Sequence, residues 1–215
     1  MKQIKRICDF YAVTHRLKNT LRSGWQVWGM DAARLESVAE HIYGTQMLAL
    51  AIHSEFGLKL DIVKVALMLA IHELGECIIG DIPATGRKIT HEQKHAMEAE
   101  AVQKILGGLT SAARIMKLFG EFEEHKTPEA HFARLVDKLE CDFQCKYYEE
   151  TGCNDFGKPR SPECREKIKT FIENGYTIAD AWINHDVECF FRDEDLFRQI
   201  ADFVKNNKVF ADADK

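Results

Sequence analysis

The chain lacks several features that would assign it to common protein classes. Its longest unbroken apolar run, Val65 to Ile71, is far shorter than the roughly 20 residues that cross a bilayer. No continuous apolar segment follows the basic start of the chain, so we expect no signal peptide. Positive charge is not in excess, because the formal net charge is -5. Nucleic-acid binders normally carry a basic face, so we expect neither a nucleic-acid polymer nor a membrane as partner.

The sequence also lacks a disulfide framework. Its seven cysteines are odd in number and irregularly spaced, and no Cys-x-x-Cys pair occurs. This pattern predicts free thiols in a reducing, cytoplasmic setting. The 215 residues suffice for one large domain, or for one domain with an appendage.

Alternating strand patterns are absent, whereas signals that start helices recur. Ser37 and Glu40 form a capping-box pattern before a long helix, and Asp61 can cap the next helix, with Gly75 as its stop. We therefore predict an all-α fold of about eight or nine helices. Further helices are expected to begin near Thr90, Thr110, Thr127–Pro128, Ser161–Pro162 and Asp193.

The segment 151–162, "TGCNDFGKPRSP", is rich in Gly, Pro and polar residues and is the best candidate for a linker. It divides the predicted core, 1–151, from a linker and helical extension over 152–215. We expect the helices of the extension to pack on the core, where they would cover a site or a subunit interface.

An acidic cluster follows the most apolar segment of the chain. In "ALMLAIHELGECIIGDIP", residues 66–83, an apolar helix predicted over 61–74 runs into His72, Glu73, Glu76 and Asp81. No Lys or Arg lies between positions 65 and 86. Ionised carboxylates beside a buried segment are costly unless they are compensated. A divalent cation offsets this cost, because imidazole and carboxylate together are an ordinary ligand set.

Further ligands would have to come from other helices. His41 lies on an apolar stripe of the helix that Ser37 caps, although a lone histidine on such a stripe is more often a hydrogen-bonded core residue. Asp137 lies one turn from each of two small residues, Ala133 and Cys141, which leave space around it. The zinc-protease motif is absent, because the position four after His72 is a glutamate.

Three ordered motifs, "ESVAEH", "HELGECIIGDIP" and "LVDKLE", resemble the HD-domain metal-dependent phosphohydrolases, and more narrowly their small 5'-deoxynucleotidase branch. The resemblance covers roughly residues 15–150. It implies an HD-domain helical bundle with additional C-terminal helices, one divalent ion (Mn, Co, Zn, Ni, Fe or Mg), a nucleotide substrate and a homodimer. Carried over by position, it makes His41, His72, Glu73 and Asp137 the metal ligands, Glu76 and Asp81 the catalytic carboxylates, and Arg22 and Trp25 of "LRSGW" the substrate contacts.

Two features depart from the family pattern. Glu73 stands where the family has Asp, and the extra methylene moves its carboxylate by about 1.5 Å, the length of one covalent bond. The C-terminal extension is the second departure.

Three further residues have open roles. Trp25 has an alternative role as a core aromatic. Lys88 and Lys94 are further cations that could face a phosphate, although surface lysines are usually only solvated.

The residue types suit phosphomonoester hydrolysis, because a metal ion can bind phosphate and carboxylates can move protons. The leading prediction is a 5'-nucleotidase that converts deoxyribonucleoside 5'-monophosphates to deoxyribonucleosides and phosphate. One alternative is another HD phosphohydrolase, acting on a nucleoside triphosphate or a guanosine alarmone; Cys77 after Glu76 argues against the alarmone enzymes. The other alternative is a non-catalytic HD-like binding module.

Overall fold

The computed structural model describes residues 1–30, 35–83, 89–153 and 162–210. Within these ranges the regular secondary structure is helical, and isolated bridge residues such as the antiparallel pair Leu21 and Ser37 form no strand. The predicted all-α class is confirmed. Lys88, Ser161 and most of the candidate linker lie outside the described residues. None of the described helices combines the length and hydropathy needed to cross a membrane.

The helices are α1 (Lys2–Thr14), α2 (Ser23–Val27), α3 (Val38–Phe56), α4 (Ile62–Ile71), α5 (Glu76–Ile79), α6 (His91–Leu106), α7 (Ala112–Glu124), α8 (Pro128–Glu150), α9 (Pro162–Glu173), α10 (Ile178–Cys189) and α11 (Asp195–Asn206), with a 3-10 turn, η1 (His15–Lys18), after α1. The described part of the chain thus has more helices than expected. The additional ones include α2 and α5, which are single turns too short to show a periodic pattern.

Side-chain caps account for several helix starts, as predicted. The Ser37 hydroxyl accepts from the Glu40 amide, and the Glu40 carboxylate accepts from the Ser37 amide, so the capping box is complete at the start of α3. Asp61 caps α4 by accepting from the Lys64 amide. The capping box of Thr90 also forms at the start of α6. Each cap satisfies amide groups that a helix start leaves without partners.

One predicted helix end was wrong, and two predicted helix starts are displaced by one residue. α4 ends at Ile71, where His72 is its C-cap, and Gly75 instead precedes α5. The α7 helix follows Ser111 and not Thr110. In the same way α11 follows Glu194 and not Asp193. Caps of this kind depend on the path by which the chain enters a helix, which neighbouring elements determine.

One capping box was missed by sequence analysis. The Thr177 hydroxyl accepts from the Asp180 amide, and the Asp180 carboxylate accepts from the Thr177 amide, at the start of α10. Asp180 occupies the position that Glu or Gln holds in the usual capping box, and its carboxylate accepts the corresponding hydrogen bond from the Thr177 amide.

The chain divides into two compact units. The first comprises Met1–Arg22, Glu36–Ile82 and Arg87–Arg134, and the second comprises Ser23–Leu35, Pro83–Gly86 and Leu135–Lys215. These units are defined by their internal contacts and not by the linker composition at 151–162. The predicted core at 1–151 and the predicted extension at 152–215 stay predictions.

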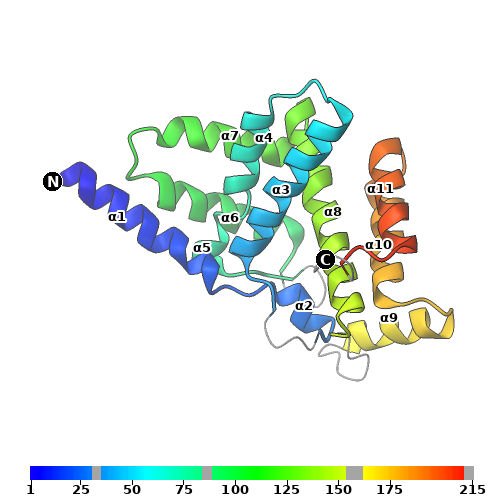
Figure 1. Ribbon diagram of the computed structural model, residues 1–215. Helices are drawn as coiled ribbons and strands as arrows, with labels where there is room; N and C mark the ends of the chain where they lie inside the picture. The colour runs from blue at the N-terminus through cyan, green and yellow to red at the C-terminus, as the bar shows by residue number, and fades with distance from the viewer. Residues whose placement is uncertain (31–34, 84–88, 154–161, 211–215) are drawn as a thin grey trace. The chain divides into compact units, whose positions relative to one another are not determined.

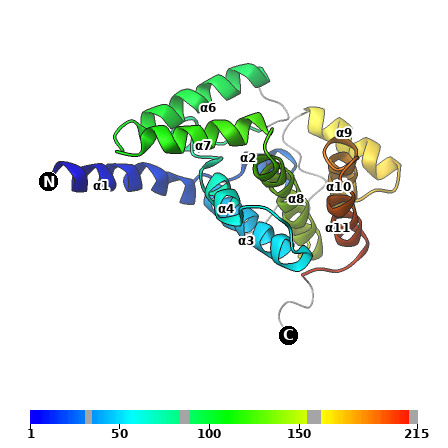
Figure 2. The same ribbon diagram turned by 90° about the horizontal axis from the view of Figure 1, so that it is seen from above.

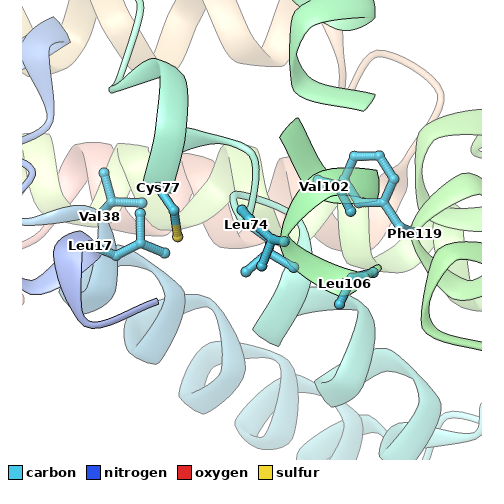
Figure 3. Packing of buried hydrophobic residues seen from close by; sticks show 8 residues of the cluster. Leu17, Val38, Leu74, Cys77, Val102, Leu106 and Phe119 are labelled. Atoms are coloured by element: carbon cyan, nitrogen blue, oxygen red, sulfur yellow. The ribbon is translucent and has the colours of Figure 1, made fainter. Parts of the chain in front are cut away.

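Apolar side chains from several helices form the core of the first unit. Helices α3 and α4 lie side by side in Figure 1, and helices α6 and α7 lie side by side in Figure 2. Figure 3 shows how side chains of η1, α3, α5, α6 and α7 meet. The buried members of this cluster are Leu17, Val38, Leu74, Cys77, Val102, Ile105, Leu106 and Phe119.

Aromatic packing dominates the core of the second unit. Trp25 is only 2% exposed; its ring lies edge-on to Tyr148, with centroids 5.4 Å apart, and is tilted against Trp182 at 4.9 Å. α10 and α11 lie side by side in the same unit. All seven cysteines of the chain are free thiols, as predicted.

A carboxylate is also buried in this second unit. Asp142 on α8 is fully buried, and neither of its oxygens has a hydrogen-bond partner among the described residues. Burial, with the nearby charge of Asp186, raises the pKa of Asp142 well above its usual range. Burial likewise raises the pKa of Asp186, against the opposing effect of its 2.7 Å hydrogen bond with His185 Nδ1. A raised pKa means that folding favours the protonated carboxyl of Asp142.

We predict that Asp142→Asn makes the protein more stable at alkaline pH. The unfolded chain ionises Asp142 near pH 4, whereas the folded protein holds the proton to higher pH, so the wild type loses stability as pH rises between these two values. The variant lacks this loss, so its free energy of unfolding at pH 8 should exceed that of the wild type. Urea unfolding at several pH values measures it.

The exposed Asp202→Asn on α11 is the matched control and should change stability little. If Asp142→Asn lost as much stability as the wild type between pH 5 and pH 8, the Asp142 carboxyl would not be the group responsible.

Candidate active site

Two histidines face one another inside the first unit. His41 lies on α3 and is fully buried, and His72 ends α4 and is 8% exposed. Their Nε2 atoms are 3.4 Å apart. His72 Nδ1 lies 2.8 Å from the Leu69 carbonyl oxygen, which can only accept, so Nδ1 carries the proton. The Nε2 lone pair of neutral His72 is therefore directed toward His41, as in a metal-ligating imidazole whose other nitrogen is held by a carbonyl.

Glu73 adds a carboxylate to this pair. Its Oε1 lies 3.7 Å from His72 Nε2. His41, His72 and Glu73 each offer a ligand atom, and these atoms lie within 4.8 Å of one another. The early end of α4 makes this possible, because the chain turns at residues 72–75 instead of continuing the helix. A turn directs successive side chains differently from a helix, in which neighbouring residues point about 100° apart.

Basic side chains from outside the segment also reach the acidic cluster. Arg22 Nη1 lies 2.9 Å from Glu73 Oε1. Lys94 of α6 has its Nζ 3.2 Å from Glu98 and 3.8 Å from Glu76. The expectation that a metal ion alone would offset the carboxylates was therefore too narrow. Arg22 and Lys94 are remote in sequence, so the absence of basic residues between 65 and 86 did not reveal them.

Glu76 is the least compensated carboxylate of the cluster. It is 2% exposed, and neither oxygen has a hydrogen-bond partner among the described residues. Burial is the largest cause that raises the pKa of Glu76 well above its usual range, followed by the negative charges of Glu73 and Asp81. Arg22 and Lys94 oppose this shift without cancelling it. A raised pKa means that folding favours the protonated form of this carboxyl group.

Gly75 lets α6 approach the cluster closely. A Cβ atom at this position would lie 3.0 Å from the Glu98 Cα atom and 3.1 Å from its carbonyl oxygen, which is closer than carbon atoms normally pack. The same approach brings Lys94 and Glu98, one turn apart on α6, beside Glu76. Burial acts to lower the pKa of Lys94, but the carboxylates around it raise the pKa overall, so Lys94 stays positively charged.

The other predicted site residues lie as follows. Asp81 follows α5 in the first unit, and its charge acts on Glu76. Asp137 lies on the part of α8 that belongs to the second unit, is 7% exposed and accepts from Lys138 Nζ at 2.7 Å. Trp25 belongs to the aromatic core of the second unit. Its packing there matches its alternative role, and its contact with substrate stays a prediction.

Comparison with known proteins identifies the family. A family model described as "HD domain" matches residues 14–179. The chain belongs to the HD domain family. This confirms the resemblance that the three ordered motifs indicated, and the match extends past residue 150, where the motifs end.

Members of the HD domain family similar to this chain carry related names. The "5'-deoxynucleotidase HDDC2" of Danio rerio is 35% identical over 153 residues, covering 70% of this chain and 72% of that protein. Its counterpart of the same name in Dictyostelium discoideum is 30% identical over 173 residues, covering 77% of this chain and 86% of that protein.

A solved structure, described as a "predicted metal-dependent phosphohydrolase" from Magnetospirillum magnetotacticum MS-1, has a TM-score of 0.62 with 23% identity. The superposition covers 95% of this chain and 96% of the other chain, so the similarity of fold extends over nearly the whole length.

The donor set of this HD domain fits a divalent cation. Two imidazoles and a carboxylate suit first-row transition ions, and the His72 tautomer presents the required lone pair. The buried Glu76 carboxyl, whose oxygens have no hydrogen-bond partner among the described residues, leaves hydrogen-bonding capacity unused beside this donor set. Divalent-metal use is thus consistent with the residues themselves as well as with the family.

We predict that the pKa of Glu76 in metal-free protein shifts in opposite directions in two variants. Lys94→Gln removes a positive neighbour and should raise it, whereas Glu73→Gln removes a negative neighbour and should lower it. The carboxyl signal of Glu76, assigned by its loss in Glu76→Gln, can be followed by infrared or NMR titration. Glu100→Gln, an exposed position on α6, is the control and should leave the Glu76 titration unchanged. Shifts of the same sign in both variants would contradict the electrostatic cause.

Proposed function

We propose that this protein is a metal-dependent 5'-nucleotidase that hydrolyses deoxyribonucleoside 5'-monophosphates to deoxyribonucleosides and phosphate. The observation that carries the proposal is that His41, His72 and Glu73, side chains that could hold a metal ion, lie with a separate buried carboxyl group whose pKa is raised, Glu76. Phosphomonoester hydrolysis needs both a phosphate-binding cation and a proton donor. The similar proteins named above are 5'-deoxynucleotidases by name, which supports the substrate class.

His41, His72 and Glu73 would hold one divalent ion, with Asp137 as the fourth ligand. When bound, the ion neutralises negative charge on the phosphate and makes water a better nucleophile. The carbonyl of Leu69 holds His72 in the tautomer that leaves Nε2 available. Glu73 replaces the shorter Asp of the family pattern, and its hydrogen bond to Arg22 keeps the longer side chain oriented.

Arg22 and Lys94 are the cations that would bind the phosphate. Both lie at the acidic cluster, and Lys94 is only partly exposed. A guanidinium can bind two phosphate oxygens at once, whereas an ammonium acts as a point charge. A phosphate that engages them would also bring added negative charge close to Glu76, which raises the pKa of that carboxyl further.

Glu76 would give its proton to the 5' oxygen of the leaving nucleoside. The raised pKa favours the protonated form of this carboxyl, the state that a general acid requires before the P–O bond breaks. Asp81, whose charge helps to hold that proton on Glu76, would orient the attacking water. Two carboxyl groups in different environments can in this way perform opposite tasks.

The ligand set predicts how substitutions of Glu73 affect metal binding. Glu73→Ala should lower the affinity for Mn or Co ions by about tenfold or more, as loss of a ligand or of its support commonly does. Glu73→Asp should retain both metal and activity. Elemental analysis and the ion-dependent rise in melting temperature measure binding independently of turnover.

Glu100→Ala is the matched control, because Glu100 is an exposed carboxylate of α6 that belongs to none of the side-chain groups that could hold a metal. It should bind metal as the wild type does. Unchanged metal affinity in Glu73→Ala would remove Glu73 from the ligands.

Deoxyribonucleotides should be hydrolysed faster than ribonucleotides. Both carry the same 5' phosphate, so only a site that excludes the 2'-hydroxyl distinguishes them. Burying a hydroxyl without a partner costs about 1 to 3 kcal/mol, equivalent to roughly 5- to 150-fold discrimination. Phosphate release from matched pairs of mononucleotides measures the ratio, and equal rates would reject the deoxynucleotide assignment.

If Trp25 supplies the bulk that excludes the hydroxyl, Trp25→Phe should narrow the ratio mainly by improving the ribonucleotide. The aromatic replacement preserves part of the packing of this buried residue, whereas Ala would cost about 3 to 5 kcal/mol of stability. Trp28→Phe is the matched control, because Trp28 also packs against Trp182, and it should leave the ratio unchanged.

A further inference from the structure

The first unit contains a cavity that is distinct from the acidic cluster. Its volume is about 400 Å³, within the range of small-molecule sites. α1, η1, α5, α6 and the turn after α6 form its walls. None of the candidate catalytic or metal-binding residues lines it.

Three cations line this cavity without a carboxylate partner. They are Arg6 of α1, Arg16 of η1 and Lys104 of α6. Among the described residues, the contact found for these three side chains is a 3.4 Å hydrogen bond from Arg16 Nη1 to the Cys77 carbonyl oxygen. The single acidic residue of the lining, Asp9, is engaged by Lys5 at 2.6 Å. Among the described residues the lining therefore carries three cations against one carboxylate, so its charge is net positive.

The remaining wall is apolar. Phe10, Val13 and Leu109 line it and also pack against the core cluster of the first unit, so they are held in place from behind. Ile78 of α5 is 41% exposed and contributes an apolar surface on the other side. Cations beside a fixed apolar wall are an arrangement suited to a ligand with an anionic end and an apolar body.

We propose that this cavity is a second, non-catalytic binding site for an organic phosphate. A dianionic phosphate would lie against Arg6, Arg16 and Lys104, and a flat apolar group attached to it would lie on Phe10 and Leu109. Phosphate is favoured over carboxylate, because two guanidinium groups and an ammonium match a dianion with three oxygens better than a single charge with two. The proposal does not depend on the activity proposed for the acidic cluster.

Phosphonates, whose C–P bond cannot be hydrolysed by a phosphatase, are suitable probes for the full-length protein. Phenylphosphonate carries both the anionic end and a ring, methylphosphonate carries the anionic end alone, and benzyl alcohol carries the ring without the charge. The methyl NMR signal of Ile78 reports on the cavity locally, and that of Ile183, buried in the second unit, is the internal reference.

We expect phenylphosphonate to shift the Ile78 signal and to bind about tenfold or more tightly than methylphosphonate, since burying part of a ring is worth about a power of ten in affinity. Affinity should fall as salt is added. The double variant Arg6→Gln, Lys104→Gln should bind at least about tenfold more weakly. Lys117→Gln, an exposed charge on α7 outside the cavity, should bind as the wild type does.

Circular dichroism of the double variant establishes that it is folded. The proposal is overturned if Ile78 does not respond to phenylphosphonate, if the double variant binds it unchanged, or if benzyl alcohol binds as tightly. Failure to hydrolyse any nucleotide would count against the acidic cluster as a catalytic site but would leave this titration unaffected, because it measures occupancy of the cavity and not turnover.

Discussion

Burial of the Glu76 carboxyl is the constraint on which the acidic cluster depends. An ionised carboxylate in such a place would cost several kcal/mol without a partner. The structure relieves that cost in two ways, since the raised pKa favours the protonated form of Glu76 and the positive charges of Arg22 and Lys94 lie close by. A divalent ion bound beside Glu73 would add positive charge to the same cluster.

The path of the backbone in the first unit places the carboxylates of the acidic cluster. α4 ends before His72, and α5 is a single turn, so Glu73 and Glu76 do not follow the regular spacing of one helix. Gly75 removes the side chain that would otherwise hold α6 away, because its Cβ would meet the Glu98 backbone. Short, irregular segments that are fixed by well-packed helices are a common means of placing catalytic groups.

Two positively charged regions of the first unit have different surroundings. At the acidic cluster the cations are matched by carboxylates, so the balance between them sets the pKa of Glu76. In the cavity lined by α1 and α6, three cations face a single carboxylate, Asp9, which pairs with Lys5. The first arrangement suits the movement of protons, and the second suits the retention of an anion. α5 connects them, because Glu76 begins this helix and Ile78, two residues later, lines the cavity.

The order of apolar stripes, caps and motifs in the sequence determined the all-α class, most helix starts and membership of the HD domain family, because these depend on local spacing. His41, His72 and Glu73 could be named in advance as candidate metal ligands from the motifs that contain them, and the structure brings their ligand atoms close together. The contacts of Arg22 and Lys94 and the end of α4 at Ile71 could not be predicted, and the burial of Trp25 was only one of two open alternatives. Each results from packing between segments distant in sequence, and only the tertiary structure decides which remote cation approaches a buried carboxylate.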